Sequence, residues 1–235
     1  MDRGVFLKHK SREHSTKGIY IRQFIFGTED GLIGGLGLIT GVSVATLDPA
    51  IIIISGVALM LTQAVSMGTG TYLSIKSQRE VYDRYLEKEK EEIRKVPRVE
   101  REEVRQIYYR HGFRGRELKN IADRITSNKR AWLSVMMAEM GVSKKGLEKP
   151  GLATLIMALS VMLGAFIPLM PHFFLASYSG IAASVVMTVI ALFVFGAAKS
   201  VITKRSLIKS GLEMMVIGMG AAGVGYIIGD LLGTI

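Results

Sequence analysis

Five apolar runs of about 20 residues or more alternate along the chain with polar stretches that hold all of its basic residues. An α-helix needs about 20 residues to cross the ~30 Å hydrocarbon core of a bilayer. The hydropathy pattern therefore predicts five membrane-spanning helices. The predicted spans are Phe24–Ala45, Ile51–Ile75, Gly151–Met170, Phe173–Ala198 and Gly211–Leu232.

The basic residues predict how these helices are oriented. All 30 Lys and Arg residues fall within 1–22, 76–149 and 199–209. Because Lys and Arg favour the cytoplasmic side of a membrane, these three stretches are expected inside. The short turns 46–50 and 171–172 carry no Lys or Arg and are expected outside. Five spans then place the N-terminus in the cytoplasm and the C-terminus outside.

The segment 76–149 has a different composition from the apolar runs. It holds 20 of the 30 basic residues and 13 of the 20 acidic ones, which predicts a water-exposed module between the second and third spans. Its pattern is helical and is interrupted at Pro97, Gly112 and Gly141, which are residues that end helices. The predicted helices are 77–95, which continues from the second span, 99–111, 116–126 and 129–140.

These patterns predict an all-α membrane protein of five transmembrane helices with a cytoplasmic helical module inserted between helices 2 and 3. The net charge of +10 is concentrated where membrane orientation requires it, so we expect no nucleic-acid partner. The chain has no cysteine, so a bound metal ion must use oxygen, imidazole or thioether ligands. The predicted organisation is 1–22 as a cytoplasmic N-terminal segment, 23–75 as helices 1 and 2, 76–149 as the module and 150–235 as helices 3–5.

Two adjacent carboxylates, Glu29 and Asp30, lie early in the first predicted span. Ionisable side chains in a bilayer are costly and usually face an interior cavity or an ion pathway. The alternative is that both lie at the level of the lipid headgroups, where carboxylates are tolerated. Small residues also line this span and permit close helix packing. They are Gly27, Gly31, Gly34, Gly35, Gly37 and Gly41.

Near its end, the second predicted span contains the sequence 66–70, Ser-Met-Gly-Thr-Gly, with Gln63 one turn earlier. Methionine in a membrane helix ordinarily fills space. Here, small neighbours would leave the Met67 thioether exposed to a cavity. With the Asp30 carboxylate it would form a mixed soft and hard site, which suits a borderline transition metal better than Ca²⁺ or Mg²⁺.

Within the module, paired glutamates repeat on two consecutive predicted helices. Residues three apart share one helix face, and the break at Pro97 would bring the two faces together. Four converging carboxylates need cations to stabilise them, as in carboxylate-rich di-iron bundles; the alternative is an ordinary solvated face. The pairs are Glu89 with Glu92 and Glu100 with Glu103, and the later helix adds Met136, Met137 and Glu139 beside Trp132.

A further carboxylate, Glu213, opens the fifth predicted span close to Lys209. Pairing at the membrane interface is its simplest role, and proton relay is the alternative. The sequence has no Walker loop, nucleophile elbow or zincin helix. This absence argues against ATP-driven pumping and hydrolysis, so we do not expect an enzyme.

Taken in order, these elements resemble the vacuolar iron transporter family, and the resemblance covers nearly the whole chain from about residue 20. The matching elements are Asp30-Gly31-Leu32, Ser66-Met67-Gly68 followed by Tyr72-Leu73 and Lys76-Ser77-Gln78, Val96-Pro97 between paired glutamates, Trp132 with Met136-Met137, residues 164–169 (Gly-Ala-Phe-Ile-Pro-Leu), and Glu213.

The resemblance implies a homodimer of five-helix protomers that exchanges cytosolic Fe²⁺, and often Mn²⁺, for protons, with a metal-binding module between helices 2 and 3. It implies that Asp30 and Met67 are transmembrane metal ligands. It also implies ligands in the module at Glu89, Glu92, Glu100, Glu103, Met136, Met137 and Glu139. One position departs from the family pattern, because plant members have a glutamate where this chain has Leu59. Glu29 is a candidate replacement.

The sequence therefore predicts a proton-coupled transporter that moves Fe²⁺, with Mn²⁺ as a second substrate, out of the cytosol and so serves iron homeostasis. No prosthetic group is expected. The alternative is a membrane-anchored iron-binding or ferroxidase protein that does not transport. Candidate proton-coupling residues are Glu29 and Glu213. The cytoplasmic membrane of a prokaryote is the expected location, and a vacuole-type membrane satisfies the same charge rule.

Overall fold

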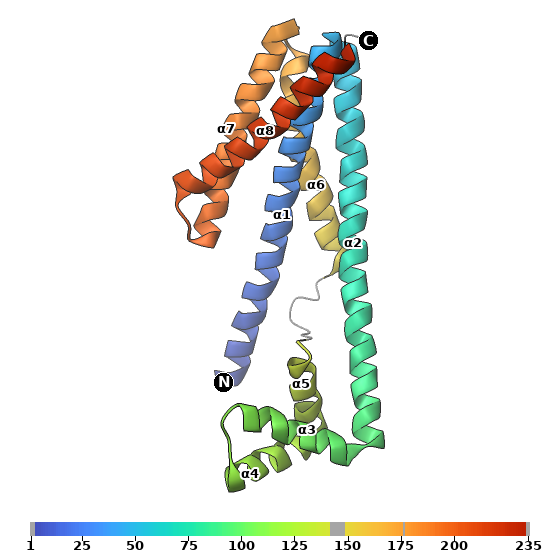
Figure 1. The fold of residues 1–235 in the computed structure, drawn as a ribbon, viewed down its shortest axis with the longest axis vertical. Helices are drawn as coiled ribbons and strands as arrows, with labels where there is room; N and C mark the ends of the chain where they lie inside the picture. The colour runs from blue at the N-terminus through green and yellow to red at the C-terminus, as the bar shows by residue number, and fades with distance from the viewer. Residues whose placement is uncertain (1–2, 142–148, 176, 234–235) are drawn as a thin grey trace. The chain divides into compact units, whose positions relative to one another are not determined.

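The computed structural model describes residues 3–141, 149–175 and 177–233, all of which form helices or the short links between them (Figure 1). The chain divides into two compact units. The first, here called the membrane unit, contains Met1–Leu73 and Lys149–Ile235. The second, called the module, contains Ser74–Glu148.

The membrane unit is built from long helices joined by short links. The first link is a tight turn with Leu47 at φ 53°, after which Asp48 Oδ1 accepts a hydrogen bond from the Ala50 backbone N–H at 2.8 Å and Pro49 begins the next helix. The elements are α1 (Arg3–Thr46), α2 (Pro49–Lys95, of which residues to Leu73 belong to this unit), α6 (Pro150–Leu169), the 3₁₀ turn η1 (Met170–Phe173), α7 (Ser177–Thr203) and α8 (Leu207–Gly233).

Four helical segments of the described chain are long and apolar enough to cross a membrane. They are Pro49–Lys95, Pro150–Phe173, Tyr178–Ser200 and Leu207–Gly233. The predicted first span, which lies in α1, is not among them. Glu29, Asp30 and the many glycines of α1 lower its mean hydropathy, so the first predicted span stays a prediction.

α1 packs against α6, α7 and α8. Glycines allow these helices to approach until their backbones touch. A Cβ atom at Gly225 would overlap the carbonyl oxygen of Gly37, and one at Gly164 would overlap that of Thr28. Likewise, a Cβ atom at Gly229 would overlap the carbonyl oxygen of Gly41. The Gly225-x-x-x-Gly229 element thus serves a contact within one chain, between α8 and α1.

The boundaries of two predicted elements shift in the structure. The predicted outer turn 171–172 is part of η1, and the His172 side chain is buried, where its Nε2 lies 3.1 Å from Ser43 Oγ of α1. The fourth span was expected to end at Ala198, but α7 continues to Thr203 and so includes Lys199. In both places a polar side chain beyond the apolar run contacts α1, His172 at Ser43 and Lys199 at Glu29.

The module combines the last part of α2 with α3 (Pro97–Arg110), α4 (Gly115–Thr126) and α5 (Lys129–Glu139). Its core is a cluster of buried residues around Trp132, which contains Val104, Ile107, Ala122 and Met136. The three predicted helices after Pro97 are confirmed to within two residues at each end. Gly112 with φ +99° and Gly141 with φ +69° follow α3 and α5, since glycine readily adopts positive φ.

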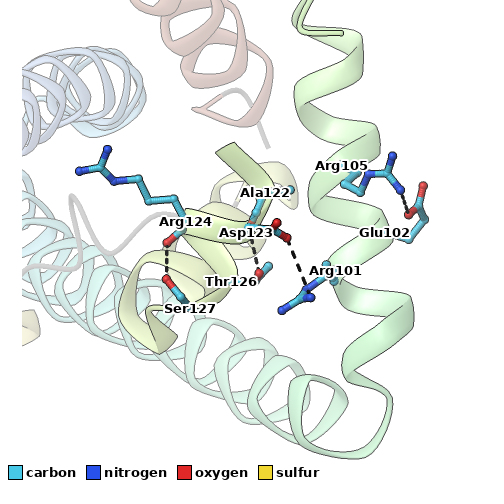
Figure 2. Close-up of polar contacts among 8 residues, drawn as sticks. All are labelled: Arg101, Glu102, Arg105, Ala122, Asp123, Arg124, Thr126 and Ser127. Carbon is cyan, nitrogen blue, oxygen red and sulfur yellow. Dashed lines mark hydrogen bonds and ion pairs between the residues drawn. The ribbon is translucent and has the colours of Figure 1, made fainter. Parts of the chain in front are cut away.

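On the module surface, polar contacts connect α3 and α4 (Figure 2). Arg101 lies 3.9 Å from Asp123, and Arg105 pairs with Glu102 at 2.9 Å on α3 itself. All four side chains are about half exposed, so these pairs contribute at most about 1 kcal/mol each. The buried apolar cluster, rather than these pairs, holds the module together.

Candidate functional site

Asp30 is held by α2 inside the membrane unit. Its Oδ2 accepts a hydrogen bond of 2.5 Å from Nε2 of Gln63, and both side chains are partly buried. One turn of α1 before Asp30, Gly27 and Thr28 are buried, and the Thr28 hydroxyl donates to the Phe24 carbonyl at 2.8 Å. The polar atoms of this part of α1 are therefore bonded, and the Asp30 carboxylate is aimed at α2.

On α2, Met67 lies four residues after Gln63, on the same helix face, and is partly buried. The next residue, Gly68, is in van der Waals contact range of Thr154 and Ala158 of α6, because a Cβ atom there would lie 3.4 Å from the Ala158 Cβ. That Met67 and Asp30 form one metal site stays a prediction from the sequence. The Gln63 hydrogen bond itself was missed, since only the tertiary fold brings residues 33 apart together.

Glu29 has a partner of opposite charge on α7. Its Oε2 lies 3.5 Å from Nζ of Lys199, and the two side chains are 22% and 40% exposed, respectively. The sequence assigned Lys199 to a loop, so this pair was not predicted. The Lys199 ammonium compensates the charge of Glu29. Of the two adjacent carboxylates, Asp30 is the one that has no basic partner among the described contacts.

In the module, Glu89 of α2 and Glu100 of α3 are buried, with 2% and 4% of their surface exposed. Burial, followed by the nearby carboxyl groups of Glu100, Glu92 and Glu103, raises the pKa of Glu89 from 4.5 to about 7. Burial also raises the pKa of Glu100, whereas the hydrogen bond from Glu89 lowers it. Both carboxyl groups therefore hold a proton to higher pH than a solvated glutamate does.

The other two glutamates of the predicted cluster are more accessible. Glu92 is partly buried and lies 3.6 Å from Nζ of Lys88, and Glu103 is exposed. One oxygen each of Glu89 and Glu100, namely Oε1 and Oε2, is buried without a hydrogen-bond partner. The four predicted glutamates thus influence one another, with Glu89 and Glu100 at the centre.

The remaining predicted ligands of the module have other contacts. Met136 and Met137 are both 4% exposed, and Met136 is part of the apolar cluster around Trp132. Glu139 pairs with Arg110 of α3 at 2.5 Å. In the described residues no three His, Asp or Glu side chains are already arranged around a common point. Glu213, at the start of α8, is exposed.

The fold and these residues define a multi-pass α-helical membrane protein with a carboxylate between its helices and a second carboxylate cluster in an inserted module. The chain matches the VIT family over residues 21–230. Vacuolar iron transporter 1 of Arabidopsis thaliana is 34% identical over 227 residues, which cover 96% of this chain and 91% of that protein. Vacuolar iron transporter 1 of Eucalyptus grandis is 34% identical and is covered to 88%, together with 93% of this chain.

A protozoan relative shows the same extent of similarity. The vacuolar iron transporter of Plasmodium berghei is 31% identical over 241 residues, which cover 97% of this chain and 87% of the relative. The chain belongs to the VIT family, and the resemblance found in its sequence motifs is confirmed.

Proposed function

We propose that this protein transports Fe²⁺, with Mn²⁺ as a second substrate, out of the cytosol in exchange for protons. The observation that carries the proposal is the Asp30 carboxylate, which lies inside the membrane unit and is bonded to Gln63 rather than to a cation. A protein that used its helices only as an anchor would gain nothing from this costly group. Membership in a family whose relatives are named iron transporters supports the same function.

In this mechanism, Asp30 and Met67 supply the ligands at which the substrate ion crosses. A carboxylate oxygen together with a thioether favours a borderline ion over Mg²⁺ or Ca²⁺. Proton exchange is the finer part of this proposal, and it follows from the family resemblance of the motifs. Glu29, if released from Lys199, and Glu213 are the further candidates for carrying protons.

The module collects ions at the cytoplasmic side. Glu89 and Glu100 both hold a proton to higher pH than a solvated glutamate does, and a divalent ion that binds between them would displace these protons. Glu92 and Glu103 supply additional negative charge at the same place. Met136, Met137 and Glu139 would have to leave their present packing and ion pair to join the ion as ligands, so the module would change its shape when it is loaded.

The proposed topology has five spans, with α1 as the first, the N-terminus and module in the cytoplasm and the C-terminus outside. The distribution of Lys and Arg supports this orientation. The proposed assembly is a homodimer, as the family resemblance of the sequence motifs implies. A stable, active monomer in a mass measurement of the detergent-solubilised protein would contradict it.

A set of matched variants tests the division of labour between the two regions. Asp30→Ala should abolish transport while the module still binds metal, because an ion in a low-dielectric site needs a charged ligand. Met67→Leu keeps the volume and removes the sulfur, so it should weaken Fe²⁺ transport without unfolding the protein.

Replacement of Glu89, Glu92, Glu100 and Glu103 together by Gln should reduce transport at low ion concentration and affect it less at saturation. The measurement is the initial uptake rate in proteoliposomes as a function of Fe²⁺ concentration. If the four-glutamine variant lost transport at every concentration while Asp30→Ala remained near normal, the pathway would not pass Asp30.

A further inference from the structure

The Gln63 side chain is divided between a bonded nitrogen and an unbonded oxygen. Nε2 donates to Asp30 Oδ2 at 2.5 Å, whereas Oε1 is buried and accepts no hydrogen bond. A buried amide oxygen without a partner costs about 1–3 kcal/mol. Such a cost at a position where α1 and α2 meet through few contacts suggests that the oxygen has a partner in another state of the protein.

The charge of Asp30 fixes which way the amide points. A carboxylate only accepts hydrogen bonds, so the NH₂ group faces it and the carbonyl oxygen is left for a different partner. Gly34 of α1 leaves room for the amide, because a Cβ atom at this position would lie 3.1 Å from Nε2 and 3.6 Å from Oε1 of Gln63. The amide is therefore held in one orientation, by a hydrogen bond on one side and a bare stretch of α1 on the other.

Charge around this position is low for a site that takes a divalent ion. Glu29 is paired with Lys199, and position 59, one turn before Gln63 on α2, is a leucine. Among the described side chains of α1 and α2 at this position, Asp30 is then the negative ligand, and the site needs neutral donors to complete its coordination. Gln63 and Met67 stand four residues apart on one face of α2 and provide an amide oxygen and a thioether.

We propose that Gln63 Oε1 is a ligand of the transported ion, with Asp30 and Met67, and that it is the oxygen donor of α2 in this chain. The assignment rests on the proposed function, since it names a further ligand of the same site. Its Nε2 keeps Asp30 in place while Oε1 contacts the ion. A neutral donor lets the site bind a divalent ion without adding a second group that must lose a proton.

Two substitutions separate the oxygen from the N–H donor. Gln63→Leu removes both, whereas Gln63→Glu keeps an oxygen and loses the amide donor. Thr62→Val is the matched control, because the exposed Thr62 hydroxyl bonds only to carbonyl oxygens of its own helix, 2.7 Å from that of Ala58. Initial rates of Fe²⁺ and Mn²⁺ uptake are measured in proteoliposomes across a range of concentrations.

Gln63→Leu should raise KM about tenfold, and more for Mn²⁺ than for Fe²⁺, because Mn²⁺ depends more on oxygen ligands. Gln63→Glu should keep KM at or below that of the unmodified protein. Thr62→Val should leave the KM for Fe²⁺ and the KM for Mn²⁺ unchanged. If Gln63→Glu were impaired as severely as Gln63→Leu, Gln63 would only position Asp30 and the assignment would be overturned. An unchanged KM in Gln63→Leu would overturn it as well.

A binding measurement separates this assignment from transport itself. Mn²⁺ binding is measured by electron paramagnetic resonance on full-length protein in detergent that carries the four module glutamates as Gln, with Trp132 fluorescence as the check of folding. Gln63→Leu in this background should weaken Mn²⁺ binding about tenfold. If Gln63→Leu weakened Mn²⁺ binding while the unmodified protein showed no uptake in proteoliposomes, Gln63 would stand as a metal ligand and the transport function would be refuted. If the background protein with and without Gln63→Leu bound Mn²⁺ equally well, Gln63 would not be a ligand.

Discussion

Glu29 and Asp30 are neighbours in sequence but have partners on different helices. Successive residues of an α-helix are about 100° apart around its axis, so Glu29 meets Lys199 of α7 and Asp30 meets Gln63 of α2. One carboxylate is compensated by a cation and the other is held by a neutral donor. We infer that the two acids, although adjacent, have different roles.

This difference predicts the behaviour of the Glu29–Lys199 pair. Lys199→Met leaves a half-buried carboxylate without its cation and should lower the thermal unfolding midpoint by a few degrees. Glu29→Gln combined with Lys199→Met removes both charges and should restore most of the loss. Lys204→Met, which changes an exposed lysine beyond α7, is the control. A double variant as unstable as Lys199→Met alone would show that the two charges are not coupled.

From sequence, a single residue stands out where its type is costly by itself. Asp30 is a candidate because a carboxylate in an apolar run demands a reason. Gln63 was noticed beside the Ser-Met-Gly element, yet its hydrogen bond depends on how α1 meets α2. Lys199 was assigned to a loop because its charge ends the apolar run, although α7 continues past it.

At the scale of elements, the α1–α8 contact depends on glycine. Gly225→Ala would drive a methyl group into the carbonyl oxygen of Gly37, and the backbone would have to move. We expect a loss of about 1–3 kcal/mol or more. Gly223→Ala is a matched control on the same helix, since nothing lies within 4 Å of a Cβ atom there.

The measurement is the thermal midpoint of the detergent-solubilised protein, with size-exclusion chromatography to detect aggregation. Gly223→Ala should be neutral or slightly stabilising, because alanine favours a helix over glycine. Equal midpoints for the two variants would mean that α8 does not pack on α1 through this face.

The buried Glu89 carboxyl group, near the turn between α2 and α3, predicts that the stability of the module depends on pH. The pKa of Glu89 is raised to about 7, so the folded module binds more protons than the unfolded chain between about pH 4.5 and 7. The contribution of Glu89 to the stability of the module is therefore most favourable below about pH 4.5, and it falls as the pH rises to 7. The loss, about 3 kcal/mol for a shift of this size, stops once Glu89 is ionised.

Trp132 reports on this effect, because it is the one tryptophan of the chain and lies in the module core. Denaturant unfolding of the whole protein is followed by its fluorescence at pH 5 and pH 8. Glu89→Gln should be more stable than the unmodified protein at pH 8 and nearly equal at pH 5. Glu87→Gln, on the same helix and exposed, should follow the unmodified protein. A Glu89→Gln midpoint below that of the unmodified protein at pH 8 would refute the raised pKa.

Elements are predicted well where a single signal dominates. Pro97, Gly112 and Gly141 end helices for local reasons, and the structure confirms the module helices they separate. The convergence of Glu89 and Glu100 follows from helix periodicity and the short break at Pro97. The positions of Met136 and Glu139 depend on how α5 packs, and sequence spacing does not contain that information.

For the whole molecule, the alternation of apolar and charged segments predicts an all-α membrane protein, and four helical segments of the described chain are apolar enough to span. The first predicted span, in α1, is not among them, and the proposed function gives a reason. The carboxylates and glycines that make α1 less apolar are the residues that would handle ions and let other helices pack closely. Hydropathy is therefore least informative at the helix that carries the proposed site.

The central claim is that the protein carries Fe²⁺ across a membrane, and its most direct test is uptake into proteoliposomes. The vesicles contain an iron-sensitive dye in an acidic buffer. Iron kept in the Fe²⁺ state by a reductant is added outside at neutral pH. We expect dye signal and a rise of internal pH in vesicles with the unmodified protein, and neither with Asp30→Ala. A silent dye, while the same protein binds iron in detergent, would contradict transport and favour a membrane-anchored iron-binding or ferroxidase protein.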